Sequence, residues 1–468
     1  MYKINKFNEL NIRLLKITIN NIKNTENGVI DFPINDQESE RKASVLGIYG
    51  ANGSGKTAVI SSLGILKNIM SGLPLRDDAY HYISKDKKEA FLKFDFSIKH
   101  FYFSGIISYQ FNLIKDDENL RVFVSNERIN YKLDTEKSLT TLIDVSRDSK
   151  SPLFTPKYKF EDLSKKHHDK IIDLVVSNKM SALKQESFVF RKETLEILNT
   201  TWQKEEEIRI LMSLKEYARM NLFVVSNENK GHLSGDTLPL FFRLSDNETN
   251  SILSGSLGIS YGKTELSQYY YDIYVKITAQ LSHIINMIIP DMNLVTETYG
   301  ETILKNGEKG IKFELMSVRN NIKIPIKYES DGIKKIISIL SSLIAIVNKE
   351  GVLVAVDELD SGVFEYLLGE LLEIINNSGQ GQLIFTSHNL HPLELLNSDN
   401  IYFTTINPKN RYIKFNNVKT TNNLRNLYLR EIVLRSTGQK EIVYDDIKSY
   451  KISKAFRKAG SLYGEISS

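Results

Sequence analysis

Residues 45–57 read VLGIYGANGSGKT, and this stretch decides the fold. The apolar run over 45–49 predicts a buried strand, and a helical pattern begins at Thr57. Between them the sequence fits the phosphate-loop pattern G-x-x-x-x-G-K-[ST], in which glycines let backbone N–H groups turn towards a phosphate. Lys56 is placed to reach the β- and γ-phosphates of ATP, and Thr57 to offer a hydroxyl to Mg²⁺. The residues expected to bind the nucleotide are Gly50, Asn52, Gly53, Ser54, Gly55, Lys56 and Thr57.

A second motif supplies adjacent carboxylates. Residues 352–356 form an apolar run that predicts a buried strand, and Asp357 and Glu358 follow it directly. Ligands bind at the carboxyl ends of the strands in open α/β sheets. We therefore expect Asp357 to hold Mg²⁺ through water and Glu358 to orient or deprotonate an attacking water. Many strands end in acidic turns, so this motif alone is a weak signal for a nucleotide site. Together with the phosphate loop it becomes a strong one.

The next predicted strand ends in Phe-Thr-Ser-His at 385–388. Its position relative to the two earlier motifs favours a contact between His388 and the γ-phosphate or the attacking water. The alternative is a surface or capping histidine. His391 follows three residues later, but no third ligand accompanies the two histidines, so no metal pair is predicted.

Residues 329–332, Glu-Ser-Asp-Gly, open the helix that precedes the acidic strand. Ser330 is a suitable N-cap, and capping alone could account for it. The same geometry also makes an anion site from a hydroxyl and free N–H groups. The residues themselves leave both interpretations open.

Composition excludes several classes of protein. The chain has 468 residues, of which 41% are hydrophobic and 25% charged, so collagen-like, mucin-like and largely disordered chains are ruled out. It has no cysteine, which excludes disulfide scaffolds, cysteine–zinc sites, iron–sulfur clusters and thiol catalysis. The longest apolar stretch, 336–347, is shorter than the roughly 18–20 residues of a membrane span. Residues 1–10 lack the apolar core of a signal peptide, so we expect a cytoplasmic protein without a membrane partner.

Strands that alternate with helices predict a parallel sheet covered on both faces. The expected fold class is therefore α/β, with a phosphate-loop mixed sheet, an antiparallel meander and an inserted, mainly helical region. Within the insertion, residues 227–263 are expected to be loops and residues 264–289 one long helix. The expected segments are 1–155, an N-terminal lobe with the phosphate loop and the meander; 156–290, the helical insertion, for dimer or partner contacts; 291–410, a C-terminal lobe with the other three motifs; and 411–468, a basic C-terminal segment.

In this order the four motifs resemble the ABC-type ATPases of the SMC/RecF/OLD (overcoming lysogenization defect) group. The resemblance covers about 1–155 and 291–410, with 156–290 in the place of the group's variable insertion. It implies an ATPase head that binds ATP and Mg²⁺, with Thr57 and Asp357 at the metal. It also implies that two heads sandwich two nucleotides, so that Ser330 and Gly332 of one head contact the γ-phosphate held by the other. A homodimer or a higher even assembly follows from the resemblance. The catalytic residues that it implies are Lys56, Glu358 and His388.

Departures from the group's pattern favour its OLD-like branch. Asp331 replaces a glycine of the signature, and Phe364 stands where SMC-type heads carry an aspartate. No long heptad pair interrupts the chain, which excludes a full SMC coiled coil. Gln110 is a candidate for the group's Q-loop glutamine only because it lies in the meander. The segment after Asn410 is too short for a Toprim nuclease domain of typical size and contains no Asp-x-Asp.

The resemblance thus implies a stand-alone ATPase subunit of a bacterial anti-phage (abortive infection) system. Such a subunit senses infection and controls a separately encoded effector nuclease, of Toprim or HNH type. Two alternatives stay open. One is a DNA-repair or DNA-maintenance ATPase of the SMC/RecF type, and the other is a nucleotide-gated scaffold with little turnover.

Charge is unevenly distributed along the C-terminal part of the chain. Residues 351–400 carry eight acidic residues and no Lys or Arg, whereas residues 411–458 carry twelve basic and four acidic residues. The basic segment could contact DNA or a partner protein. It could equally pack on the acidic face of its own fold. The sequence favours neither. The basic residues include Arg425, Arg430, Arg435, Lys448, Lys451, Lys454, Arg457 and Lys458.

Overall fold

The computed structural model describes most of the chain. The described residues are 11–32, 43–146, 153–225, 237–246, 251–415, 423–434, 452 and 454–458. Their strands and helices confirm the expected α/β class, with a mostly parallel central sheet and a separate antiparallel sheet. Among the described helices, none combines the length and the apolar character needed to cross a membrane.

The central sheet carries three of the four motifs. Its neighbouring strands are parallel, except for one antiparallel pair at its edge. Three of its inner strands are buried along their whole length, as their apolar sequences predict. Because they run in parallel, their carboxyl ends meet at one edge of the sheet. Within the described chain, the order across the sheet is β19 (Tyr412–Ile413), β18 (Ile401–Thr404), β3 (Ser44–Tyr49), β17 (Gln382–Thr386), β16 (Leu353–Val356) and β9 (Leu222–Val225).

The antiparallel sheet forms the predicted meander. Its strands alternate buried and partly exposed residues, so one face packs on the core and the other meets solvent. Among the described residues, its order is β2 (Thr25–Asp31), β1 (Asn11–Ile22), β4 (Glu89–His100), β5 (Phe103–Asp116), β6 (Arg121–Leu133), β7 (Thr140–Ser146) and β8 (Phe154–Thr155).

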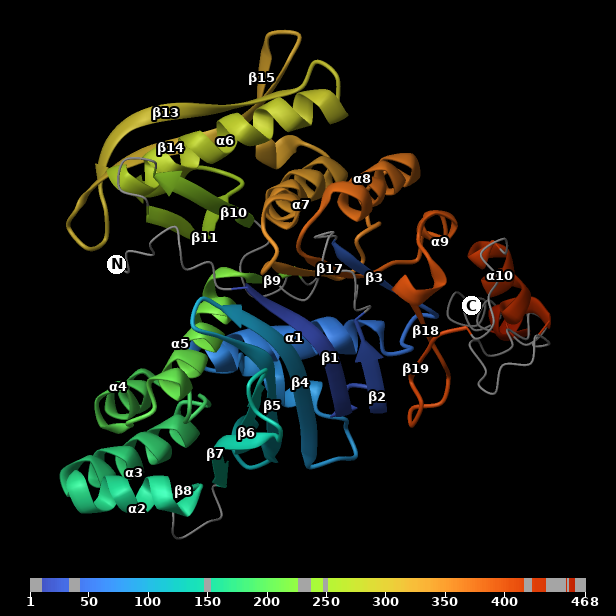
Figure 1. The fold of residues 1–468 in the computed structure, drawn as a ribbon. Helices are drawn as coiled ribbons and strands as arrows, with labels where there is room; N and C mark the ends of the chain where they lie inside the picture. Colours follow the sequence, from blue (N-terminus) through green and yellow to red (C-terminus); the bar gives the residue numbers. More distant parts are fainter. Residues whose placement is uncertain are drawn as a thin grey trace, which may run out of the picture.

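Helix α1 (Lys56–Ser71) begins directly after the phosphate loop and lies between the two sheets (Figure 1). Its side chains share one apolar core with the antiparallel sheet and with one face of the central sheet. Helix α5 (Glu205–Met220) completes this layer. Gly72 ends α1 in a left-handed conformation, with φ of 70°. Burial of α1 on both sides fixes the loop that precedes it relative to both sheets.

The opposite face of the central sheet is covered by helices from the C-terminal part of the chain. They share a second apolar core with that face. Phe403 of β18 stacks on Phe415 and Tyr428, with ring centroids 4.0 Å and 5.0 Å apart. These helices are α7 (Asp331–Asn348), α8 (Glu365–Ser378), α9 (Pro392–Leu395) and α10 (Leu424–Leu434).

Two further units extend the body. One consists of helices beside the antiparallel sheet: α2 (Lys157–Lys166), α3 (His168–Leu183) and α4 (Lys192–Thr201). The other lies above and to the left of α7 in Figure 1. It contains β10 (Thr237–Asp246), β11 (Ser251–Ser260), β12 (Thr264–Ser267), α6 (Gln268–Ile288), β13 (Asn293–Ile303), β14 (Lys309–Arg319) and β15 (Ile322–Pro325). Short 3-10 helices are η1 (Asp77–Tyr82), η3 (Ile326–Tyr328) and η4 (Ser398–Asn400).

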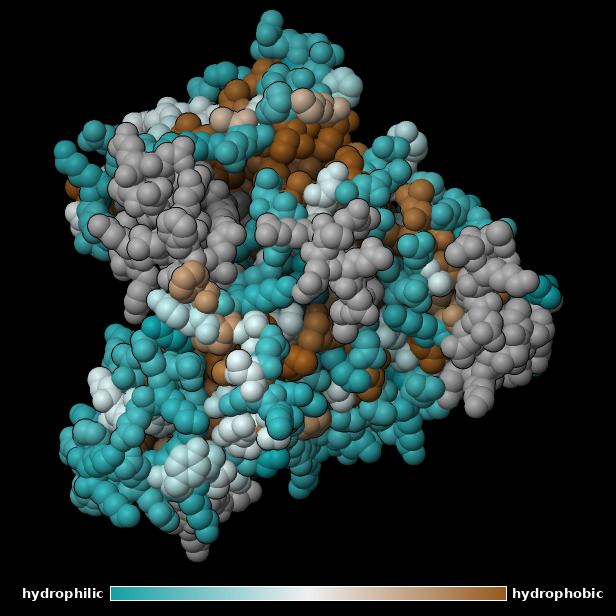
Figure 2. All heavy atoms as spheres, in the orientation of Figure 1, coloured by the Kyte–Doolittle hydropathy of each residue, from teal (hydrophilic) through white to brown (hydrophobic). Residues whose placement is uncertain are grey.

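The surface in Figure 2 is mostly hydrophilic, with an apolar area where α6 faces α7. Partly buried isoleucines of both helices pack there against the core of the upper unit, among them Ile284, Ile288 and Ile344.

The region 156–290 differs from the expected helical insertion. Strand β9 lies inside it and pairs in parallel with β16, so the insertion contributes a strand to the central sheet. Part of the expected loop region forms the β10–β11 hairpin, in which the buried Leu240 and Leu257 face each other. The expected long helix is preceded by β12, and α6 begins at Gln268. Tertiary pairing decides these strands, because four-residue runs and Gly- and Ser-rich segments carry little local strand signal.

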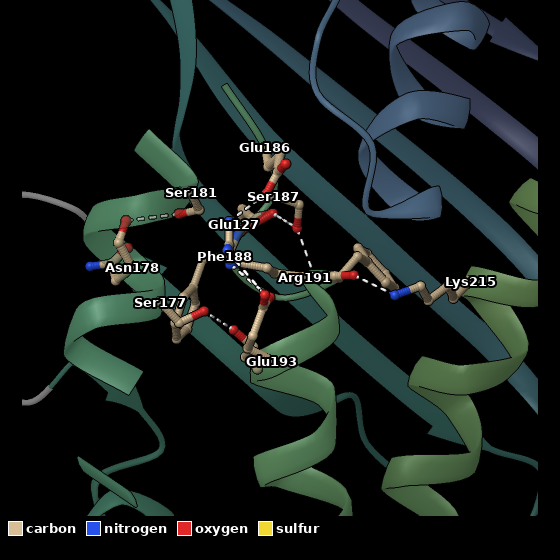
Figure 3. A network of polar contacts seen from close by, with 12 residues as sticks. Glu127, Ser177, Asn178, Ser181, Glu186, Ser187, Phe188, Arg191, Glu193 and Lys215 are labelled. Atoms are coloured by element: carbon tan, nitrogen blue, oxygen red, sulfur yellow. Dashed lines mark hydrogen bonds and ion pairs between the residues drawn. The ribbon is translucent and has the colours of Figure 1, made fainter. Parts of the chain in front are cut away.

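A buried carboxylate ties the meander to the helical unit (Figure 3). Glu127 of β6 is 2% exposed and accepts four hydrogen bonds from groups outside its own strand. The donors are Tyr109 Oη at 3.0 Å, Ser187 Oγ at 2.5 Å, Phe188 N at 2.9 Å and Val189 N at 3.1 Å. A buried carboxylate is tolerated only when such donors replace water.

We expect Glu127→Ala to lower the free energy of unfolding by about 3 kcal/mol or more, because charged hydrogen bonds are lost and buried N–H groups are left without an acceptor. Denaturant unfolding followed by circular dichroism measures this. Glu196→Ala is the matched control, since its exposed carboxylate makes only a 3.8 Å ion pair with Lys192 and should change stability by less than about 0.5 kcal/mol. Equal losses in the two variants would contradict the assignment.

Candidate phosphate-binding site

The phosphate loop runs from the end of β3 into α1, as predicted. Gly50 has φ of 154°, and a Cβ there would lie 1.7 Å from Thr404 Oγ1. Gly55 has φ of 96°, and its Cβ would lie 2.8 Å from Thr25 Oγ1. Both positions therefore exclude a side chain, because the loop packs closely against neighbouring segments.

Those segments come from far along the chain and were not identified from the sequence. Ser54 Oγ donates to the carbonyl of Ala51 at 2.6 Å and shares a hydrogen bond with Thr404 Oγ1. Tyr412 Oη donates to the carbonyl of Gly55 at 2.8 Å. Strands β18 and β19 thus brace the loop by side chains, and Asn52 and Gly53 remain exposed at its tip.

Lys56 is 6% exposed and folds over the loop. Its Nζ donates to the carbonyl oxygens of Gly50 at 2.8 Å and Ala51 at 2.9 Å. Burial lowers the pKa of Lys56, whereas the nearby carboxylates of Asp357 and Glu358 act in the opposite direction. The ammonium group is therefore held within the electrostatic field of the acidic loop that follows β16.

Asp357 lies at the end of β16 and is buried. Its Oδ1 accepts a hydrogen bond from Thr57 Oγ1 at 3.4 Å and another from Thr386 Oγ1 at 2.6 Å. The first contact joins residues that are 300 positions apart. A hydroxyl and a carboxylate are the hard oxygen ligands that Mg²⁺ accepts beside waters and phosphate oxygens, so Thr57 and Asp357 fit such an ion. The described residues hold no cluster of three or more His, Asp or Glu side chains suited to a metal.

Glu358 adopts an unusual backbone conformation. Its φ is 48°, in the left-handed region that costs a non-glycine residue about 1–2 kcal/mol. Its N–H donates to Thr386 Oγ1 at 2.7 Å, so one threonine hydroxyl contacts both acidic residues. Its carbonyl oxygen accepts from Ser361 N at 3.0 Å and from Lys335 Nζ. Such strain persists only where surrounding contacts over-determine it, and it is typical of functional sites.

His388 follows β17 at the same edge of the sheet. Partial burial and the charge of Lys56 lower the pKa of His388, and the carboxylates of Asp360, Glu358 and Asp357 oppose that shift. The imidazole therefore shares one electrostatic environment with the phosphate loop and the acidic residues. Asp360, which sequence analysis missed, fixes the histidine backbone. Its Oδ2 accepts from the N–H groups of His388 and Asn389, each at 3.0 Å.

The serine-glycine motif, Ser330 to Gly332, lies at the start of α7 and not at the phosphate loop. Ser330 caps α7 and accepts from Ile333 N at 3.4 Å, so the capping interpretation holds in this chain. A Cβ on Gly332 would lie 2.1 Å from the carbonyl oxygen of Gly362, so the start of α7 packs against the acidic loop. Among the described residues, no hydrogen bond joins Ser330 or Gly332 to the phosphate loop.

Two other predicted features lie apart from this site. Gln110 is on β5, opposite Lys93, and is an ordinary residue of the antiparallel sheet. The basic segment begins by packing on its own fold, since Arg425 of α10 pairs with Glu394 of α9 at 3.1 Å. Lys414 Nζ also donates to the carbonyl of Asp399 at 2.6 Å. Arg435, Lys448 and Lys451 lie outside the described residues.

No protein-family model matches the sequence, and no curated protein does. Similar solved structures include the Smc head domain of Pyrococcus furiosus bound to the C-terminal domain of ScpA, at 12% identity and a TM-score of 0.38, covering 86% of this chain and 96% of that one. The recombination mediator RecF with ATP matches at 13% identity and a TM-score of 0.33, over 81% of this chain and 94% of that one. The SMC head domain of Thermotoga maritima matches at 11% identity and a TM-score of 0.33, over 86% and 99%.

We expect Gly50→Ala to weaken ATP binding by at least about tenfold, because its Cβ would displace Thr404 and the loop with it. Gly300→Ala is the control, because Gly300 lies on β13, outside the phosphate loop. Its φ of 109° also disfavours a side chain, but nothing lies within 4 Å of its Cβ. Titration with a fluorescent ATP analogue measures both affinities. If Gly300→Ala weakened binding as much as Gly50→Ala, the close packing on Thr404 would not be the cause.

Proposed function

We propose that the chain binds ATP with Mg²⁺ and hydrolyses it. The observation that carries this proposal is the contact between Thr57 Oγ1 and Asp357 Oδ1, at 3.4 Å. It brings the hydroxyl that follows the loop lysine to the carboxylate at the end of a buried strand. Lys56 precedes Thr57 and Glu358 follows Asp357 in the chain, and the charge of Lys56 interacts with both carboxylates. Residues from three strand ends thus converge where a bound triphosphate and its metal ion would lie.

Each side chain has a role in this proposal. The loop N–H groups and Lys56 bind the phosphates, and Thr57 and Asp357 hold Mg²⁺, which when bound neutralises charge on the β- and γ-phosphates. Glu358 accepts the proton of the attacking water. His388, whose pKa is lowered by partial burial and by the charge of Lys56, contacts the γ-phosphate or the water.

The proposed assembly is a homodimer or a higher even assembly in which Ser330 and Gly332 complete the site of a second copy. The exposed start of α7 supports this, since the side chain of Asp331 is 96% exposed. Large apolar side chains are exposed in the same region of the chain. Tyr328, two residues before Ser330, is 71% exposed, and Phe364, two residues after Gly362, is 73% exposed. Exposed aromatic residues of this kind are enriched at protein interfaces.

For the biological role we propose a cytoplasmic ATPase subunit of the OLD-like kind that controls a separately encoded effector nuclease, of Toprim or HNH type, in anti-phage defence. The support is the resemblance of the motifs, in particular the Glu-Ser-Asp-Gly signature and the missing coiled coil. The main alternative is a DNA-maintenance ATPase of the SMC/RecF type. Arg425 of the basic segment already forms an ion pair with Glu394, which counts against a DNA contact by this side chain.

We expect Glu358→Gln to bind ATP with nearly unchanged affinity and to lose at least about a hundredfold in hydrolysis rate, because the amide cannot accept the proton of the water. We expect Lys56→Ala to lose ATP binding itself. Phosphate release and nucleotide titration separate the two effects. Glu370→Ala on α8, outside the site, serves as the control. Hydrolysis at the wild-type rate in Glu358→Gln would overturn the role assigned to Glu358. A wild-type chain that binds ATP with little turnover would leave only the nucleotide-gated scaffold.

We expect a small nuclease to co-purify in stoichiometric amount when the tagged chain is recovered from its own host with its neighbouring genes intact. Mass spectrometry identifies the partner, and Lys56→Ala tests whether the association depends on ATP. Recovery of a homo-oligomer that carries DNA and no nuclease would favour the DNA-maintenance ATPase instead.

A further inference from the structure

We propose that Lys335 of α7 is a positioning residue for Glu358 and couples the exposed start of α7 to ATP hydrolysis. This inference rests on the proposed function, since it assigns Glu358 the catalytic role. Lys335 Nζ donates to the backbone carbonyl oxygen of Glu358. The two residues belong to different elements and are 23 positions apart in the chain.

The backbone of Glu358 needs such support. With φ of 48° it occupies a conformation that a glutamate adopts rarely. Thr386 holds the N–H of Glu358, at 2.7 Å, from the β17 side. Its carbonyl oxygen accepts from Ser361 N, at 3.0 Å within the same loop, and from Lys335, which is the donor on the α7 side. A charge-assisted hydrogen bond to that carbonyl favours the strained conformation over the relaxed ones that would turn the carboxylate elsewhere.

A second contact makes α7 and the acidic loop move together. Gly332 and Lys335 are three residues apart, so they lie on the same face of the helix. A Cβ on Gly332 would lie 2.1 Å from the carbonyl oxygen of Gly362, and one on Gly362 would lie 3.1 Å from Gly332 Cα. The two backbones are therefore in direct contact, which joins the first turn of α7 to the loop that carries Glu358.

The start of α7 is at the same time open to a partner. Ser330 and Asp331 are exposed, and the helix N-terminus offers N–H groups that favour an anion. The second copy of the proposed homodimer would bind at this exposed start and contact α7. Lys335 would carry the effect of that contact to the carbonyl of Glu358, so that assembly affects the position of the proton acceptor.

The test compares steady-state ATP hydrolysis and ATP affinity in three single variants. Lys335→Ala should lower kcat by about tenfold or more and leave ATP affinity within about twofold, because only the orientation of Glu358 changes. Lys335→Arg keeps a cationic donor and should recover most of kcat. Lys334→Ala is the matched control from the same helix turn. Its Nζ pairs with Asp331 at 2.8 Å and does not contact Glu358, so kcat should stay within about twofold.

A double variant separates positioning from a general loss of structure. In the Glu358→Gln background, Lys335→Ala should cause no further loss of the residual rate, because Lys335 acts through Glu358. An unchanged kcat in Lys335→Ala, a parallel loss of ATP affinity, or an additive loss in the double variant would each overturn the inference. If the wild-type chain hydrolyses ATP and Lys335→Ala matches it, only this inference fails. A wild-type chain that binds but does not hydrolyse ATP overturns the proposed function and this inference together.

Discussion

The carboxylate of Asp357 is the group on which the site depends. It is buried at the end of β16, where hydrogen-bond donors must replace water around a carboxylate. Thr386, at the end of the neighbouring strand, and Thr57, at the start of α1, supply those donors. Their convergence requires that β3, β17 and β16 be parallel neighbours with aligned ends. The order of the strands in the sheet therefore fixes the geometry of the site. Displacement of any of these strands would leave a buried carboxylate without hydrogen-bond partners.

Strain at Glu358 has the same origin. The chain turns directly after β16, and Glu358 has a left-handed backbone in that turn although it carries a side chain. The hydroxyl of Thr386 stabilises that turn and the Asp357 carboxylate at once. Asp360 uses its own carboxylate to hold the backbone of His388. The acidic loop thus organises the histidine loop, and in both loops side chains bind the backbone groups of other residues.

The phosphate loop is stabilised from a different direction. Thr404 and Tyr412, on the edge strands β18 and β19, hold Ser54 and the carbonyl of Gly55. They also join an N-terminal strand to a C-terminal one. Strand β19 packs beside β2 at Gly28, where a Cβ would lie 2.3 Å from the Tyr412 ring. A loop rich in glycine is flexible in isolation. Its shape here is held by side chains more than 340 residues further along the sequence.

What the sequence determined by itself was the set of local patterns with a strong chemical signature. The glycine spacing from Gly50 to Thr57, the apolar run before Asp357 and the amphipathic repeat of α7 each depend on near neighbours, so the loop, the buried strand and the helix could be predicted. Tertiary structure alone decided the partners of those patterns. No sequence pattern predicts the contacts made by Val224 of β9, the hydroxyl of Thr386 or the ammonium group of Lys335. In the sequence, Asp360 was only one more acidic residue in an acidic run. Their roles arise because parallel pairing and helix packing bring distant segments within hydrogen-bond distance, and single-sequence patterns do not record such distances.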